Sequence, residues 1–309
     1  MKKKKKYVKR DPNALSSDLI VNPIKRKVWL FLIPTFVCFV IGFVWPFASG
    51  VYLSFCQFRL IREALFIPLD KVKDVWAGFS NYTRAFADPS FKQAFIYTAK
   101  YAVVSVVVIN VLSFFLGYLL TLKIKGSNIF RATFFMPNLI GGIVLSYIWQ
   151  LIFNGILIRY NTYLTANAKF GFWGLVILMA WQQIGYMMII YIAGLQAIPG
   201  DVTEAAQIDG AGPLQRLFRV TIPMMMPSIT ICMFLSITIG FKLFDQNLSL
   251  TAGEPAKQSE LMALNIFNTF YGRTGWEGVG QAKAVLFFII VVGIGMWQLK
   301  ATRKKEVQQ

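Results

Sequence analysis

Amide and hydroxyl side chains interrupt otherwise apolar stretches of this sequence, and their chemistry suits solute binding. Gln182, Gln183 and Tyr186 cluster in one stretch, with Gln182 and Tyr186 about one helical turn apart. A polar group inside an apolar span is costly unless it has a partner, so its presence invites a functional interpretation. Sugars are bound by amide and hydroxyl hydrogen bonds and by aromatic faces, and this set fits one. An equally weighted alternative is that both glutamines only bond neighbouring helices.

A second apolar stretch carries a small and partly polar face. Ser236, Gly240 and Leu243 follow one another at i, i+4 and i+7, so a helix would place them on one side. This face could line the same solute path. The alternative is that Ser236 bonds its own i−4 carbonyl and serves packing.

Several kinds of catalytic chemistry are absent from the chain. It contains no histidine, which excludes histidine-based zinc sites and the Ser-His-Asp and Cys-His nucleophile systems. No glycine-rich stretch ends in Gly-Lys-Ser/Thr, so a phosphate-cradling loop for ATP is missing. Only 14 acidic residues occur, and none lies in the middle of an apolar stretch. We therefore expect no enzyme, no metal site and no cofactor bound by this chain.

The elements that must position these residues are membrane helices. Hydrophobic residues make up 56% of the 309 residues and charged residues only 15%, below the roughly 25% of soluble domains. Six stretches of 16 to 31 residues hold no charge, and about 20 apolar residues suffice to cross a bilayer. Lys283 and Lys300 are expected to snorkel to the headgroups at the ends of the shortest stretch.

The predicted fold is therefore all-α, a polytopic membrane protein with six transmembrane helices. A basic tail, 1–27, precedes the transmembrane domain, 28–300, and a short tail, 301–309, follows it. The predicted spans are 28–55, 94–122, 132–153, 172–196, 223–243 and 281–300.

The positions of the positive charges predict the topology. With the N-terminus in the cytoplasm, the inside segments carry 19 Lys and Arg residues and the outside segments carry 12. Positive residues mark cytoplasmic flanks, so both termini are expected inside. The net charge of +18 is thus explained by topology and by a basic tail that touches anionic lipid, and we expect no nucleic-acid partner.

Proline and glycine mark breaks between and within the spans. Pro137 followed by Gly141 and Gly142 predicts a kink in the third span. The segment 246–282 is expected to form an outside loop, with Gly253 and Pro255 among its breakers.

The segment 199–222 is the one long excursion expected on the cytoplasmic side. Asp201 and Glu204 have the spacing of a capping box that starts a helix, and Gly210 is suited to the left-handed cap that ends it. Pro213 suits the first turn of a second helix. Ala205 and Ala206 leave a small-residue surface that a partner backbone can approach closely; the second helix carries an apolar stripe, made of Leu214, Leu217 and Phe218.

The spacing in this excursion resembles the Glu-Ala-Ala loop of bacterial ATP-binding-cassette (ABC) importer permeases. Glu204-Ala205-Ala206 is followed by Gly210 after three residues, and then, after nine more, by residues 220–223, Val-Thr-Ile-Pro. Val220 and Ile222 stand where Ile and Leu are usual. Asp209, directly before Gly210, strengthens the match.

Further segments resemble the carbohydrate-uptake branch, the relatives of the maltose and glycerol-phosphate permeases. They are residues 76–82, residues 130–137, and Phe244-Asp245 ahead of residues 251–255. The last segment departs from the usual Thr-Gly-Gly-Gly-Pro. The resemblance covers about 28–300.

This resemblance implies a permease subunit with a type I importer core and a coupling helix. It would work in the bacterial inner membrane with a second homologous permease, two cytoplasmic ATPase subunits that bind ATP and Mg, and an external solute-binding protein. The loop would dock on an ATPase subunit, with Glu204 as polar anchor and Ala205, Ala206 and Gly210 enforcing a close fit. The chain would import a carbohydrate, an oligosaccharide or a sugar derivative.

The solute contacts of the maltose permease fall at matching positions of this chain. They correspond to Gln183, Tyr186, Ser236, Ile239, Gly240 and Leu243, of which Tyr186 and Ser236 retain the residue type. Two alternatives stay open. The same architecture could carry glycerol phosphate or another polar solute, or the chain could be a scaffold or channel without energy coupling.

Overall fold

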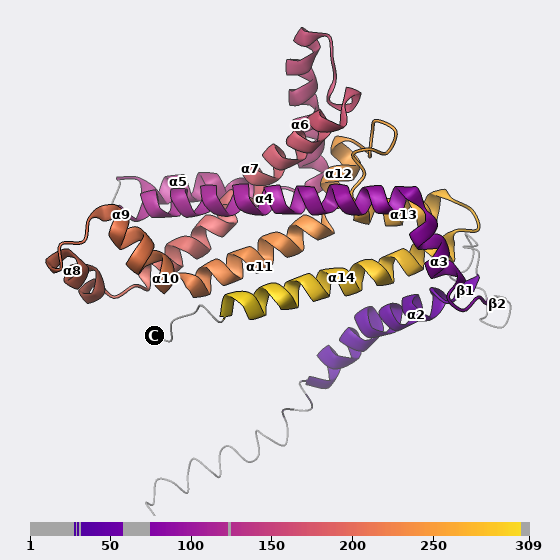
Figure 1. Ribbon diagram of the computed structural model, residues 1–309, viewed down its shortest axis with the longest axis horizontal. Helices are drawn as coiled ribbons and strands as arrows, with labels where there is room; N and C mark the ends of the chain where they lie inside the picture. The colour runs from indigo at the N-terminus through magenta and orange to yellow at the C-terminus, as the bar shows by residue number, and fades with distance from the viewer. Residues whose placement is uncertain (1–27, 29, 31, 58–74, 123–124, 304–309) are drawn as a thin grey trace, which may run out of the picture. The chain divides into compact units, whose positions relative to one another are not determined.

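The computed structural model describes residues 28, 30, 32–57, 75–122 and 125–303. The predicted tail 1–27, the end of the chain from 304 and the segment 58–74 lie outside the described residues. The chain divides into two compact units, one ending at Leu53 and the other beginning at Ser54 (Figure 1).

The described part of the first unit is one apolar helix. Leu32–Leu53 is helical over 22 residues with a mean hydropathy of 2.0, and it includes the π-helical stretch η1 (Val40–Val44) and the α-helix α2 (Trp45–Leu53). The rings of Phe39, Phe43 and Phe47 stack along it. A helix that is apolar on all sides suits a lipid environment.

The second unit opens with a short ladder and then becomes helical. β1 (Cys56–Gln57) pairs antiparallel with β2 (Val75–Trp76), two residues on each strand. The further elements are α3 (Ser80–Ala87), α4 (Pro89–Thr121), α5 (Ser127–Phe135), η3 (Met136–Leu139), α6 (Gly142–Leu157), η4 (Ile158–Tyr160), η5 (Leu164–Ala166), α7 (Ala168–Gln196), α8 (Gly200–Ile208), α9 (Pro213–Arg216), η6 (Leu217–Thr221), α10 (Ile222–Met224), α11 (Met226–Lys242), α12 (Asp245–Leu250), α13 (Met262–Gly272) and α14 (Glu277–Arg303).

Five helices of the described residues are long and apolar enough to cross a membrane. They are Leu32–Leu53, Pro89–Thr121, Gly142–Tyr160, Ala168–Gln196 and Glu277–Arg303. A sixth span is present if the pair Pro213–Met224 and Met226–Lys242, bent by 71°, counts as one. The all-α, multi-span architecture expected from the sequence is confirmed.

The predicted kink in the third span is a complete break. Pro137 lies in η3, and after it Ile140 and Gly141 adopt extended backbone, with ψ of 132° and 137°. α6 then starts in a new direction and points away from α4 and α5 (Figure 1). A helix that contains proline cannot keep all its hydrogen bonds, and here the chain leaves the helical conformation at Ile140 and Gly141 before α6 begins.

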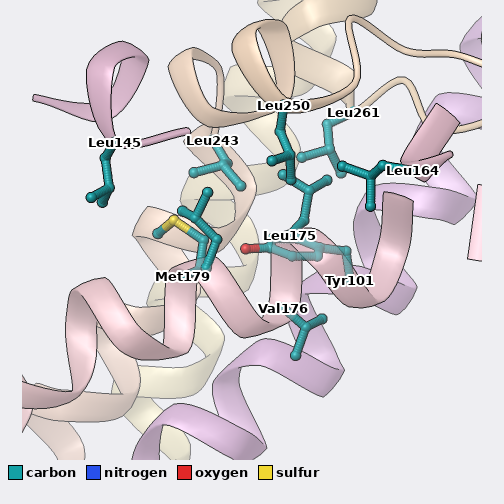
Figure 2. Packing of buried hydrophobic residues seen from close by; sticks show 10 residues of the cluster. Tyr101, Leu145, Leu164, Leu175, Val176, Met179, Leu243, Leu250 and Leu261 are labelled. Atoms are coloured by element: carbon teal, nitrogen blue, oxygen red, sulfur yellow. The ribbon is translucent and has the colours of Figure 1, made fainter. Parts of the chain in front are cut away.

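The core of the second unit forms where α4 packs along α7. Tyr101, Leu175 and Met179 lie in one buried cluster, shown in Figure 2, together with leucines from α12 and the loop after it. α5 packs so closely against α7 that a Cβ atom on Gly185 would overlap the carbonyl of Phe134. Figure 1 shows α4, α11 and α14 running alongside one another.

The segment 246–282, expected as a loop, contains most of α12 and all of α13. Its predicted breakers lie in the connection between these helices, where Gly253 has a φ of +87°. The Asn247 side chain organises this connection: its Nδ2 donates to the Ser259 carbonyl at 2.8 Å, and its Oδ1 accepts from the Leu261 amide at 2.8 Å. One buried asparagine thus closes the loop, which loop composition alone does not reveal.

The expectation that Lys283 snorkels to the headgroups is wrong. Its side chain is 0% exposed, and its Nζ lies 2.8 Å from Asp88 Oδ2. The same ammonium donates to Asn265 Oδ1 at 3.0 Å and to Thr269 Oγ1 at 2.8 Å, while Arg273 reaches Asp88 from outside at 3.1 Å. We call these five residues the Asp88 cluster; it ties α13 and α14 to the start of α4.

The Asp88 carboxylate is held in its charged form. Burial by itself raises its pKa, but hydrogen bonds from Lys283 and from Ser90 outweigh that effect and hold the pKa of Asp88 below its ordinary value. A lowered carboxyl pKa contributes stability above the pKa of the unfolded chain, about 4. The stability that the lowered pKa of Asp88 contributes is therefore complete at neutral pH and is lost only as the solution becomes strongly acidic.

We predict that the two partners of this pair respond unequally to mutation. Asp88→Asn leaves the buried ammonium of Lys283 without a carboxylate and should cost about 3–5 kcal/mol of stability. Lys283→Met should cost less, because Asp88 keeps Arg273. The double variant should recover most of the loss. Thermal unfolding of the purified protein in detergent measures all three, and a larger loss for Lys283→Met than for Asp88→Asn would contradict this account.

Candidate functional site

The first candidate site is the segment around α8, and its helix does not start as the sequence predicts. Pro199 is the N-cap residue, with φ of −59° and ψ of 137°, and no side chain caps the helix. The prediction that Asp201 and Glu204 form a capping box is therefore wrong. Asp201 lies in the first turn, where its charge is still favourable to the helix dipole, and Thr203 Oγ1 donates to the Gly200 carbonyl at 2.7 Å.

The end of α8 has the geometry expected from the sequence. Gly210 has a φ of +74°, in the left-handed region. The Gly210 amide donates to the Gln207 carbonyl at 3.0 Å, and the Ala211 amide donates to the Ala206 carbonyl at 3.0 Å. This pair of bonds is a Schellman motif, which reverses the chain within two residues. Pro213 then occupies the first turn of α9, as predicted.

The α8–α9 segment presents side chains outward. Glu204, Ala205, Asp209 and Gly210 are exposed, and Ala206 is half-buried.

Three large apolar side chains flank these polar and small residues. We call the two groups together the α8 surface. Ile208 is 86% exposed, Leu214 71% and Phe218 63%. Ile208 is not among the residues predicted from the sequence, although its position four residues after Glu204 places it on the same helix face. Exposed apolar residues gathered beside small ones form a surface suited to a protein partner.

The second candidate site is the set of polar residues on α7 and α11. Gln182 Nε2 donates to the Ile140 carbonyl at 3.3 Å, and Gln182 Oε1 accepts from Gln246 at 3.0 Å. Gln183 Oε1 accepts from Asn138 Nδ2 at 3.3 Å. Both glutamines thus bind the broken segment between α5 and α6, where the backbone needs partners.

Ser236 belongs to a hydrogen-bond network that joins three helices. Asn110 of α4 donates to Ser236 Oγ at 2.8 Å and accepts from the Tyr191 hydroxyl of α7 at 2.8 Å. Ser236 in turn donates to the Cys232 carbonyl at 2.7 Å, the i−4 bond that the sequence allowed. This network, which we call the Asn110 network, fixes α4, α7 and α11 relative to one another.

Four of the predicted solute-path residues line one small enclosed pocket. They are Gln183, Ser236, Ile239 and Gly240, and the wall opposite them is formed by Tyr101, Ser105 and Ile109 of α4. The space between these residues has no room for even one water molecule, so their side chains pack against one another. In this conformation the pocket is too small for an oligosaccharide.

The other predicted solute-path residues lie outside this pocket. Gln182 faces the break before α6, as its bonds to Ile140 and Gln246 show. Tyr186 is half-buried against the cluster around Met187. Leu243 is buried in the core cluster with Tyr101. The described residues contain no group of three acidic or cysteine side chains that could hold a metal ion.

Comparisons with known proteins place these sites in context. Residues 109–301 match the family model described as binding-protein-dependent transport system inner membrane component. The chain is 40% identical, over 91% of its length and 95% of the relative, to the probable starch degradation products transport system permease protein AmyD of Thermoanaerobacterium thermosulfurigenes. It is 29% identical, over 90% and 96%, to the multiple sugar-binding transport system permease protein MsmF of Streptococcus mutans.

A solved structure has the same fold. The crystal structure of a bacterial alginate ABC transporter, in complex with an alginate pentasaccharide-bound periplasmic protein, contains a chain that matches with a TM-score of 0.74. The match covers 92% of this chain and 96% of that chain at 17% identity.

The left-handed cap of α8 generates a prediction with a matched control. Gly210→Ala adds a side chain at a φ of +74° and should destabilise the end of α8 by about 1–2 kcal/mol. Gly212→Ala should change little, because Gly212 has a φ of −65° and open space around it. Amide hydrogen exchange over residues 200–212 measures the effect, and equal protection in the two variants would contradict the role of the cap.

Proposed function

The chain belongs to the family of binding-protein-dependent transport system inner membrane components, and from that premise we propose that it is the permease subunit of a carbohydrate importer driven by partner ATPases. As a permease, it is a transport component and not an enzyme. The observation that carries the proposal is the α8 surface, which combines the Glu-Ala-Ala spacing with exposed apolar side chains.

The α8 surface is the proposed docking site for an ATPase subunit. ATP and Mg would be bound on that partner, since this sequence has no phosphate-cradling loop. Glu204 would be the polar anchor, and Ile208, Leu214 and Phe218 would enter an apolar groove. Closure of two ATPase subunits would move α8 and switch the spans from inward-open to outward-open.

A carbohydrate is the proposed solute. The relatives AmyD and MsmF are named for starch degradation products and for multiple sugars. The polar groups of α7 and α11 are amides and hydroxyls, which suit a sugar. A phosphate-bearing solute would be held by Lys or Arg side chains. None of the predicted solute-path residues on α7 and α11 is a cation, and Lys283 of α14 is already paired with Asp88. This favours a sugar over glycerol phosphate.

A second, homologous permease is the proposed neighbour within the membrane. α6 points away from α4 and α5 (Figure 1), and it is largely uncovered by the rest of the second unit. Ile143, Tyr147, Leu151 and Ile152 are among its exposed residues. A partner helix bundle would bury this face. The pair would lie in a bacterial inner membrane, with both termini and α8 in the cytoplasm and the solute-binding protein on the opposite side.

The experiment that tests the function uses the complete transporter. This chain, its partner permease, the ATPase subunits and the binding protein are reconstituted in proteoliposomes and offered a panel of sugars and glycerol phosphate. We expect ATP hydrolysis to rise several-fold with one class of sugar and the binding protein present. Stimulation by glycerol phosphate alone would contradict the carbohydrate assignment, and failure to assemble with any ATPase would favour a scaffold or channel.

A second prediction concerns the coupling between ATP hydrolysis on the partner subunits and transport through this chain. A bulky residue in place of Ala206, such as Ala206→Trp, or a proline in place of Gly210, should abolish transport while the protein still inserts in the membrane, because the α8 surface no longer fits its partner. Thr203→Ala is a control on the same helix, since its hydroxyl bonds only the Gly200 carbonyl. Normal transport-linked ATP hydrolysis in the first two variants would defeat the proposed docking role.

A further inference from the structure

The start of α4 carries two lysines that no other described residue neutralises. Lys92 and Lys100 lie eight residues apart, so they share one helix face, with Ile96 midway between them. Both lysines are exposed, and neither forms an ion pair with another residue that the structure describes. Ile96 is 43% exposed. This face therefore combines two positive charges with an apolar surface.

These three residues line a groove between α4 and the connection from α12 to α13. Its volume is about 380 Å³, within the range of pockets that hold small ligands. Gln93 and Tyr97 of α4 and Gln258 of the connection also line it, and no acidic side chain does. We call this feature the α4 groove. Its charge suits an anion.

The two walls of the α4 groove are held together by the fold. The Met262 amide, at the end of the connection, donates to Thr98 Oγ1 of α4 at 2.8 Å, and this bond is buried. The backbone of Gln258 is fixed in turn, because its amide donates to the Pro255 carbonyl at 2.8 Å. The groove is thus formed before any ligand arrives, which lowers the entropic cost of binding.

The α4 groove lies at the depth of the lipid headgroups. The charge-free stretch 101–122 begins directly after Lys100 and spans about 33 Å as a helix. The hydrocarbon core of a bilayer is about 30 Å thick, so Lys100 falls at its edge. Lys92 lies about 12 Å farther out along the helix, past a headgroup layer of about 5–8 Å. Figure 1 shows this end of α4 far from α8.

We propose that the α4 groove binds the headgroup of an anionic phospholipid, such as phosphatidylglycerol. The ammonium groups of Lys92 and Lys100 bracket its phosphate, and the amides of Gln93 and Gln258 donate to the phosphate oxygens. Ile96 contacts the first part of an acyl chain. None of the predicted solute-path residues lines this groove, so the inference goes beyond the proposed function and does not depend on the solute.

A membrane lipid suits this groove better than a soluble anion. Exposed lysines gain little from a free ion, because water screens the attraction. A bilayer instead presents phosphate groups at this depth at a high local concentration, which makes weak contacts effective. The exposed apolar surface of Ile96 between the two charges also has no use for a soluble phosphate, whereas an acyl chain covers it.

The test measures lipid binding to the assembled transporter in detergent. Phosphatidylglycerol is titrated and the bound lipid is counted by native mass spectrometry, with phosphatidylcholine of the same acyl chains as the zwitterionic control. The double variant Lys92→Gln/Lys100→Gln should bind phosphatidylglycerol about 25-fold more weakly, because each lysine near an anionic headgroup strengthens binding about five-fold. Binding should also weaken as salt is raised.

Two further variants serve as controls. Lys92→Arg/Lys100→Arg keeps both charges and should retain binding. Lys169→Gln removes an exposed lysine at the start of α7, outside the groove, and should also leave binding unchanged. The melting temperature without added lipid should be the same in all variants; if the glutamine variant is less stable, the comparison of the arginine variant with Lys169→Gln decides.

Several outcomes would overturn the lipid assignment. Equal affinity of the unaltered protein and the glutamine variant, or equal affinity for the two lipids, would remove its basis. Binding of inorganic phosphate or glycerol phosphate as tightly as the lipid would make the groove a site for soluble anions. Unchanged lipid binding with a loss of ATP hydrolysis stimulated by the binding protein would assign the lysines to that protein. None of these measurements uses sugar uptake, so their failure leaves the proposed function standing.

Discussion

A polar group in an apolar span must find its hydrogen-bond partner inside the protein, and this requirement determines how the described helices are joined. Asn110 meets it by connecting Ser236 and Tyr191, so that three helices share one side chain. The Asp88 cluster meets this requirement for the buried ammonium of Lys283. Gln182 meets it for the Ile140 carbonyl freed at the break before α6, and Gln183 meets it for the side chain of Asn138.

These connections divide the second unit into parts with different tasks. α4 and α7 are held together by close packing and by the Asn110 network. The helix α8 does not belong to this packed pair: it is joined to the end of α7 through Pro199, and it ends at Gly210, which has a left-handed conformation. α8 is connected to α11 through the short helices α9, η6 and α10 and the 71° bend that follows them, so a force applied to α8 would reach α11 by this route. Movement of α11 relative to α4 is the change that would widen the pocket they enclose with α7.

The sequence predicts much of this architecture because several of its signals are local. Long charge-free stretches specify apolar helices, Pro137 with Gly141 specifies a break, and Gly210 specifies a left-handed turn. The failures concern partners that are distant in the sequence. Lys283 looks like a span-end lysine until Asp88, 195 residues away, is found beside it. The Asn110 network likewise joins side chains that are 126 and 81 residues apart, which no local pattern reveals.

We propose that solute passes where α4 faces α7 and α11, so that this contact must open during transport. A reversible cross-link tests it directly. A Cβ atom on Gly240 would lie 3.5 Å from Ser105 Oγ, so cysteines at these two positions should form a disulfide. In the reconstituted transporter, oxidation of the Ser105→Cys/Gly240→Cys variant should stop sugar uptake and reduction should restore it, while neither single-cysteine variant responds. Undiminished uptake by the fully cross-linked protein would contradict the account.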